Sequence, residues 1–274
     1  MQELSGRVGD TRALTDAEFE LFRRLLYTEA GISLSPGKKS MVEGRLHIRL
    51  RHFGLTDYRA YFDVIERNLN GELQTAINIL TTNETCFFRE PKHFDYLREH
   101  VLPSWNGGLH RIWSAASSSG EEAYSLAMLL AEHSRTSAWE ILGTDINTKV
   151  IKIARSGQYP MMRAKDIPVH YLKKYCLRGI GDEDGTFIIG PMIKQKVSFA
   201  NANLQKDLST FGRFDVILLR NVMIYFDVEC KRTVVAKLVR QIKPGGHLII
   251  GHSETLNGIC SELKMIMPSV YRKW

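Results

Sequence analysis

The chain has 274 residues, of which 44% are hydrophobic and 24% charged, a composition typical of globular proteins and not of disordered ones. At about 100–200 residues per domain, this length suits one large domain or two modest ones. The formal net charge of +7 attracts acidic partners without specifying nucleic acid. No apolar run approaches the roughly 18 residues of a membrane span, and residues 1–10 do not read as a signal peptide, so we expect a cytoplasmic protein.

The cysteines and histidines do not predict a metal centre. The four cysteines lie far apart, with no C-x-x-C pair, and the histidines are not clustered. This spacing favours four separate thiols in a reducing compartment over a zinc site or a disulfide framework.

The first 80 residues predict an all-helical domain. Thr15 and Glu18 form a capping-box pattern, and the helix that they begin closes at Gly31. Further helices are expected over residues 38–53, 56–65 and 72–80. Four short helices fit a small bundle over residues 1–80.

From residue 96 onward, strand-like and helix-like runs alternate. Strands are predicted over residues 111–114, 140–144, 214–219 and 247–250, and helices over 121–133, 148–156 and 228–242. This alternation predicts an α/β fold with a doubly wound, mostly parallel, Rossmann-like sheet over residues 96–274. The alternation breaks down over about 160–201, which we interpret as a small antiparallel β insertion, and residues 270–273 suit a closing antiparallel edge strand. We expect residues 81–95 to form a linker between the helical domain and the α/β domain.

The first two predicted strands end in residues that suit a ligand. Small residues follow the first strand up to Gly120, and Asp145 ends the second, at the sheet edge where ligands bind in such folds. Glu121 and Glu122 begin the next helix and would repel a phosphate but suit a cation. Asp145 can accept hydrogen bonds from both ribose hydroxyls. The alternatives are a plain tight turn and a helix cap supplied by Asp145 or Asn147.

Other polar groups are expected at the same edge. Arg220 and Asn221 follow an apolar strand, with Tyr225 about one turn further on, and Asn203 follows another strand-like run. In the linker, an aromatic pair precedes Arg89 and is expected to pack over the ligand cleft. Plain packing for Tyr225 and a surface position for Arg89 remain the alternatives.

Several of these segments together resemble one family. Thr81-Thr82-Asn83-Glu84-Thr85 with Phe87-Phe88-Arg89, Trp113-Ser114-Ala115-Ala116 with Gly120-Glu121-Glu122, Thr144-Asp145-Ile146, Arg220-Asn221-Val222-Met223-Ile224-Tyr225-Phe226 and Gly251-His252-Ser253-Glu254 resemble the chemotaxis-receptor glutamate methyltransferases, the CheR family. The order and separations also agree, from about Phe19 to Trp274.

The resemblance implies a class I methyltransferase that moves a methyl group from S-adenosylmethionine to receptor glutamates and leaves S-adenosylhomocysteine. It implies that the linker lies over the cofactor cleft and that Arg89 and Tyr225 border the reacting groups. Its cofactor-binding residues would be Asn83, Thr85, Arg89, Ala115, Glu122, Asp145, Asn203, Leu204, Arg220 and Asn221. The motif does not decide between Glu121 and Glu122, and we favour Glu122.

The resemblance also implies a partner, the cytoplasmic domain of a methyl-accepting chemotaxis receptor. The basic helix of the first domain would lie on the acidic receptor surface through Arg45, Arg49 and His52, which share one helix face. In some family members the β insertion holds a short peptide at the receptor's C-terminus, and Gly179-Ile180-Gly181 resembles that version. The protein would meet a membrane only through the receptor.

Two rival functions follow from the same residues. A nucleic-acid methyltransferase would account for the positive charge, but the Asn-Pro-Pro-Tyr type of loop found in base methylases is missing at Arg220-Asn221-Val222. A catalytically silent receptor adaptor would need only the helical domain and the insertion. The missing prolines disfavour the first rival, and the complete set of polar strand ends disfavours the second. We expect no nucleic-acid partner.

Overall fold

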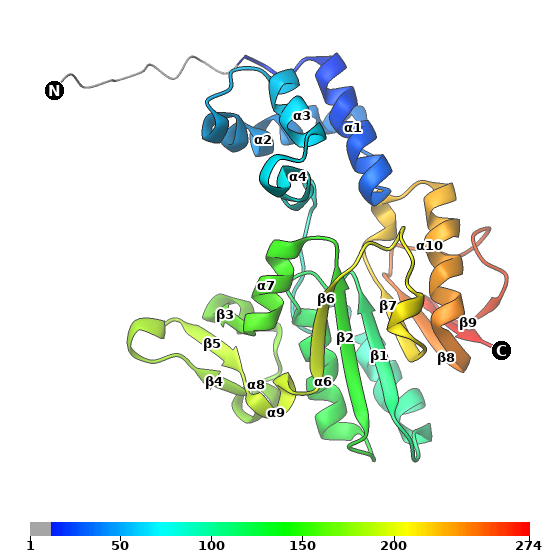
Figure 1. Cartoon of the computed structure of the whole chain (residues 1–274). Coiled ribbons are helices and arrows are strands. Elements are labelled where there is room, and N and C mark those ends of the chain that lie inside the picture. The colour runs from blue at the N-terminus through cyan, green and yellow to red at the C-terminus, as the bar shows by residue number, and fades with distance from the viewer. Residues whose placement is uncertain (1–11) are drawn as a thin grey trace. The chain divides into compact units, whose positions relative to one another are not determined.

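The computed structural model describes residues 12–274, so residues 1–11, where we expect no signal peptide, lie outside the described part. The chain divides into two compact units, one that ends at Thr82 and one that runs from Asn83 to Trp274 (Figure 1). Within residues 12–274, no helix is long and apolar enough to cross a membrane.

Between residue 12 and Thr82, the first unit folds as a bundle of four α-helices. They are α1 (Asp16–Ala30), α2 (Lys39–Phe53), α3 (Tyr58–Glu66) and α4 (Glu72–Leu80). The predicted capping box is confirmed, because Thr15 and Glu18 each accept a hydrogen bond from the other's backbone N–H, and Gly31 ends α1 in the left-handed conformation. The apolar helix faces form one core that includes Phe22, Leu46 and Tyr61. The predicted all-α N-terminal domain is confirmed.

A buried ion pair ties α2 to α4. Arg49 donates from Nε to Oε1 of Glu72 at 2.8 Å and from Nη2 to Oε2 at 2.7 Å, and the Tyr61 hydroxyl donates to Oε1 at 2.6 Å. Burial, together with the Glu72 carboxylate, raises the pKa of Tyr61 well above its usual range. The Glu72 side chain is only 3% exposed, so its charge depends on these partners for compensation.

The expected docking face on α2 is therefore only partly at the surface. Arg49 is held by Glu72, and Arg45 donates from Nη1 to the carbonyls of Leu80 at 2.9 Å and Thr81 at 3.1 Å, which caps the end of α4. Of the three residues expected to contact a receptor, only His52 is exposed. The helical spacing of Arg45 and Arg49 reflects packing inside the bundle.

The second unit is built on a seven-stranded sheet with strand order β6-β2-β1-β7-β8-β10-β9. The strands are β1 (His110–Ala115), β2 (Trp139–Asp145), β6 (Val197–Asn201), β7 (Phe214–Leu219), β8 (Ile242–Ile250), β9 (Leu263–Met267) and β10 (Val270–Lys273). The five strands from β6 to β8 run parallel, whereas β10 and β9 pair antiparallel. The helices α6 (Glu121–His133), α7 (Thr148–Ser156) and α10 (Val228–Gln241) pack against these strands.

The predicted mostly parallel α/β sheet is confirmed, with one difference at its antiparallel side. Val216 to Leu219 of β7 are all fully buried, as expected for a parallel strand covered on both faces. The strand β10 is antiparallel as predicted, but β9 lies outside it and forms the edge. The sequence analysis predicted no strand over Leu263–Met267, whose apolar residues are mostly exposed: only Leu263 of the five is buried.

A second sheet of three antiparallel strands lies between α7 and β6 in the sequence. Its strands are β3 (Gln158–Pro160), β4 (Cys176–Arg178) and β5 (Thr186–Ile189), in the order β3-β5-β4 (Figure 1). The short helices α8 (Val169–Tyr175) and α9 (Pro191–Lys194) accompany it. The predicted antiparallel insertion is present, but it is shorter than residues 160–201 because Val197–Asn201 pairs with β2 in the main sheet.

We expect the ion pair between α2 and α4 to carry much of the first unit's stability. Arg49→Ala would leave the Glu72 carboxylate buried and unpaired, so the free energy of unfolding of this unit should fall by about 3 kcal/mol. Urea unfolding monitored by circular dichroism measures the change. Arg51→Ala, an exposed arginine of the same helix, is the control and should change stability by less than about 0.5 kcal/mol. Equal stabilities of the two variants would contradict this role of Arg49.

Candidate functional site

The five parallel strands bring the polar residues expected from the sequence to one edge of the main sheet. The strands β6, β2 and β1 end at Asn201, Asp145 and Ala115, and β7 leads directly into Arg220 and Asn221. Between the neighbours β1 and β7 the strand order changes direction, and this switch point is where open α/β sheets bind ligands.

Backbone strain is concentrated in the loops of this site. Within residues 12–274, eight non-glycine residues have positive φ, and five of them lie in the linker, the turn after β1 and the end of β7. These five are Phe88, Glu90, Ala116, Ser118 and Asn221. Such conformations cost about 1–3 kcal/mol each and persist where the surroundings impose them, often at functional sites.

Asp145 is held at the end of β2 by backbone donors. Its Oδ2 accepts from the Ser118 N–H and its Oδ1 from the Asn147 N–H, both at 2.9 Å. The cap of α7 is Asn147, whose Oδ1 accepts from the N–H of Lys149 and Val150, so Asp145 is not the capping residue. Burial raises the pKa of Asp145 to about 6. The Ile146 backbone N–H is a further donor to this carboxylate, so Asp145 is an acceptor group at the strand end that backbone donors hold in place.

The linker is tied to the ends of β1 and β2. The Asn83 side-chain oxygen accepts from Asn147 Nδ2 at 2.7 Å, and the Asn83 carbonyl accepts from the Ser118 hydroxyl at 2.8 Å. Further along, the Thr85 carbonyl accepts from Nη1 of Arg163 in the insertion at 2.9 Å. Asn83 and Thr85, both expected from the sequence, therefore lie in a segment that hydrogen bonds fix to the strand ends.

The aromatic pair of the linker packs on the insertion. Phe87 is fully buried, and its ring lies edge-on to Tyr159 at 5.1 Å between centroids. Phe88 stacks on Tyr171 of α8 at 5.2 Å with an interplanar angle of 4°. These contacts fasten the linker to the insertion; that the pair also packs over a ligand cleft stays a prediction.

Arg220 joins three segments through a buried ion-pair network. Its Nη1 donates to Oε2 of Glu122 at 2.7 Å, and its Nη2 lies 3.1 Å from Oε2 of Glu90 and also donates to the Arg89 carbonyl. The side chain is only 2% exposed. Burial alone would raise the pKa of Glu90, but the hydrogen bond from Asn221 and the charge of Arg220 hold it below its usual value. Arg220 and Glu122 are brought together as expected, and they form an ion pair with each other.

The two glutamates at the start of α6 differ in their surroundings. Glu122 faces Arg220, whereas Glu121 is fully buried, accepts from the Ser119 hydroxyl at 2.7 Å and lies 3.2 Å from Nη1 of Arg163. Burial raises the pKa of Glu121. Of the two, only Glu122 pairs with Arg220, the residue that follows β7, and this favours Glu122 over Glu121 as the residue on the ligand side.

The remaining expected residues have few internal contacts. Nη1 of Arg89 donates to the Glu84 carbonyl at 3.1 Å, and within residues 12–274 no carboxylate pairs with its guanidinium. Tyr225 is half-buried in a 3₁₀ turn, Met223–Tyr225. After β6, Leu204 is buried and Asn203 accepts from the backbone N–H of Gln205. Arg89 is thus a half-buried cation without a fixed anionic partner.

Sequence reasoning missed several residues of this edge. Glu90 accepts from Arg220 and Asn221, and Glu254 accepts from the N–H of Asn221 at 3.0 Å and of Gly251 at 2.7 Å, which joins the ends of β7 and β8. Glu90 adjoins Arg89 in the sequence, but its partners lie 130 and 131 positions away, so no local spacing reveals them.

The chemistry of the donor set fits an adenosyl ligand with positive charge. Three carboxylates, those of Glu90, Glu122 and Asp145, lie in this part of the structure, and they would oppose a pyrophosphate. Small residues follow β1 and allow a ligand to approach the backbone closely. Asp145 has acceptor capacity for hydroxyl groups such as those of a ribose.

Comparisons with known proteins cover nearly the whole chain. The family model described as CheR methyltransferase, SAM binding domain, matches residues 83–271, and the model described as CheR methyltransferase, all-alpha domain, matches residues 17–81. A chemotaxis protein methyltransferase of Escherichia coli (strain K12) is 41% identical over 263 residues, covering 94% of this chain and 91% of that protein. One of Borreliella burgdorferi is 38% identical and covers 95% of each chain.

The network around Arg220 generates a stability prediction. Arg220→Ala would leave the buried carboxylates of Glu90 and Glu122 without their shared cation, so we expect the second unit to lose about 3–5 kcal/mol of unfolding free energy. Urea unfolding without added ligand measures it. Arg213→Ala, at an exposed arginine just before β7, is the control. If both variants unfold at the wild-type urea concentration, Arg220 does not hold the three segments together.

Proposed function

Because the chain belongs to the CheR family of methyltransferases, we propose that it methylates glutamate side chains of chemotaxis receptors. The chain is an S-adenosylmethionine-dependent methyltransferase, as the match of the SAM-binding family model to residues 83–271 shows. The products of the proposed reaction are glutamate methyl esters and S-adenosylhomocysteine. One structural observation supports a carboxylate as the methyl acceptor. Arg89 is a half-buried cation beside the site, and no carboxylate of residues 12–274 pairs with it.

The cofactor would be held by the ends of β1, β2 and β6 together with the linker. Asp145 supports this assignment because it places a carboxylate, which is a hydrogen-bond acceptor for hydroxyl groups, at the end of β2. The small residues from Ala115 onward would lie along the cofactor, with Asn203 and Leu204 beside the adenine. Asn83 and Thr85 would act from the linker, while Glu122, Arg220 and Asn221 would border the methyl group.

The reaction requires alignment more than proton transfer. A glutamate carboxylate has an unperturbed pKa of about 4.3 and is ionised at neutral pH, so no general base is needed. When bound, the cofactor supplies a methyl group activated on a sulfonium. Holding two reactants in line can contribute roughly 7–11 kcal/mol. Arg220 is already compensated by two carboxylates, whereas Arg89 is not, so Arg89 would position the acceptor, with Tyr225 beside the reacting groups.

Receptor docking would use the exposed side of α2. His47, Arg51 and His52 are exposed there, Lys38 is exposed directly before the helix, and Ile48 is 66% exposed. A basic surface with one apolar contact suits an acidic helical partner. Arg45 and Arg49 would support this face from inside the bundle. The partner would be the cytoplasmic domain of the receptor, which places the enzyme in the cytoplasm.

The small sheet offers a second contact for the receptor. The strand β4 forms one edge of it, with Leu177 57% exposed, and Ile180 in the following loop is 83% exposed. An unpaired strand edge can accept an extended peptide as an additional strand. We propose this edge for a peptide at the receptor's C-terminus.

The reaction is tested by incubating the protein with tritiated S-adenosylmethionine, receptor-containing membranes and RNA. We expect label on receptor protein that alkali releases, as for a carboxyl methyl ester. Arg89→Ala should lower turnover by about two orders of magnitude, as misplaced reactants do, with an unchanged circular dichroism spectrum. Lys92→Ala, at an exposed neighbouring cation, is the control. Label on RNA would overturn the proposed substrate, and wild-type turnover of R89A would overturn the role of Arg89.

The docking face makes a separate prediction. Arg51→Glu should raise the KM for receptor about threefold to tenfold, the range expected for reversing one exposed charge at an interface, without changing the KM for S-adenosylmethionine. Steady-state assays at two salt concentrations measure both constants. Arg24→Glu, at an arginine of α1 whose side chain is 76% exposed, is the control for net charge. Equal effects of both reversals would show that the total charge matters and the α2 face does not.

A further inference from the structure

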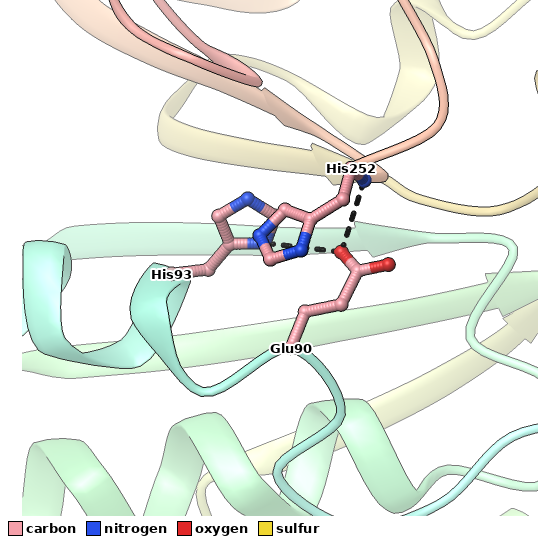
Figure 2. A group of neighbouring side chains, drawn as sticks. All are labelled: Glu90, His93 and His252. Atoms are coloured by element: carbon pink, nitrogen blue, oxygen red, sulfur yellow. Dashed lines mark hydrogen bonds and ion pairs between the residues drawn. The ribbon is translucent and has the colours of Figure 1, made fainter.

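A second cluster of chemically active side chains lies beside the Arg220 network. Glu90, His93 and His252 approach one another there, and each can offer an atom to a metal within 4.8 Å of those of the other two (Figure 2). The Nδ1 of His93 lies 3.4 Å from Oε2 of Glu90, and the two imidazole rings lie 4.6 Å apart between centroids. These histidines are far apart in the sequence, which is why their spacing predicted no metal.

His93 is the unusual member of the cluster. It is only 1% exposed, yet neither ring nitrogen has a hydrogen-bond partner among residues 12–274. Buried polar side-chain atoms in proteins are nearly always paired, so an unpaired buried imidazole calls for an explanation such as an ion. Figure 2 shows its ring beside the Glu90 carboxylate and the His252 ring.

The backbone holds these groups on ordered elements. Glu90 and His93 are three residues apart, on either side of Pro91, where the helix α5 (Lys92–Tyr96) begins. Glu90 precedes the helix with a positive φ, and its side chain nevertheless reaches His93, with 3.4 Å between Oε2 and Nδ1. His252 follows the end of β8, and its backbone N–H donates to Oε2 of Glu90 at 3.3 Å.

The local charge also admits a cation. Among residues 12–274, Arg220 is the only Lys or Arg side chain paired with Glu90 and Glu122, so these three largely buried groups carry one net negative charge. A divalent ion bound through two neutral imidazoles would offset that charge. Two nitrogen ligands and one carboxylate exclude magnesium and calcium as preferred ions and favour zinc-like ones.

We propose that Glu90, His93 and His252 bind a divalent transition-metal ion of the zinc class, with a solvent-facing position left open. His252 is exposed and would close the site around the ion. Since Glu90 also accepts hydrogen bonds from Arg220 and Asn221, a bound ion would compete for its oxygens. Occupancy should therefore slow methyl transfer, a consequence that rests on the proposed function, whereas the binding itself does not.

The test measures binding without any methyl transfer. Chelator-treated full-length protein is titrated with Co²⁺, followed by its visible absorption, and then with Zn²⁺ as competitor. We expect one site per chain whose affinity falls at least about tenfold in His252→Ala and in His93→Gln. His170→Ala, at an exposed histidine outside the cluster, should keep the wild-type affinity.

Three results would overturn the metal site. They are the absence of a stoichiometric Co²⁺ site in wild type, equal affinities of wild type and H252A, and a loss in H170A as large as in H252A. If H93Q does not fold, H252A decides alone, because an exposed residue can be truncated without disturbing the core. Methyl transfer by the chelator-treated protein is measured in parallel, so that a missing metal site and a failed methyltransferase proposal give different results.

Discussion

The buried guanidinium of Arg220 is the interaction on which the functional edge of the second unit depends. It connects the linker through Glu90, the start of α6 through Glu122 and the end of β7 through its own backbone. A cation this deeply buried is stable only with its carboxylates in place, and they are stable only with it. The loops at this edge can therefore hold strained backbone, including the positive φ of Glu90 and Asn221, because the ion pairs prevent their relaxation.

Two arginines near this network differ in their partners. Arg220 is compensated by two carboxylates and organises the site, whereas Arg89 has no such partner within residues 12–274 and can meet a substrate anion. Phe87 and Phe88 fasten the linker that carries Arg89 to the insertion. Arg163 of the insertion also donates hydrogen bonds to the Thr85 carbonyl and to the Glu121 carboxylate.

On α2, some basic residues have internal partners and others are exposed, and their spacing in the sequence does not distinguish the two groups. Arg45 and Arg49 share a helix face and look like a docking surface, but they cap α4 and neutralise Glu72. Arg51 and His52, close by on the same helix, are exposed. The acid that pairs with Arg49, Glu72, lies on another helix and comes later in the chain. The number of arginines on α2 therefore overstates the basic surface available to a partner.

Local patterns predicted the longer helices, the parallel strands and most polar residues at the strand ends, because these depend on periodicity, caps and strand-end position. They did not reveal the short helices α5, α8 and α9. Thr15 and Gly31 cap α1 as predicted, and Asp145 and Arg220 lie at the strand ends that the patterns indicated. The pairings came only from tertiary contacts: Glu90 with Arg220, Arg49 with Glu72, His93 with His252, and β9 outside β10. These contacts join residues far apart in the chain, and no local spacing encodes which distant charge or ring will share a buried place.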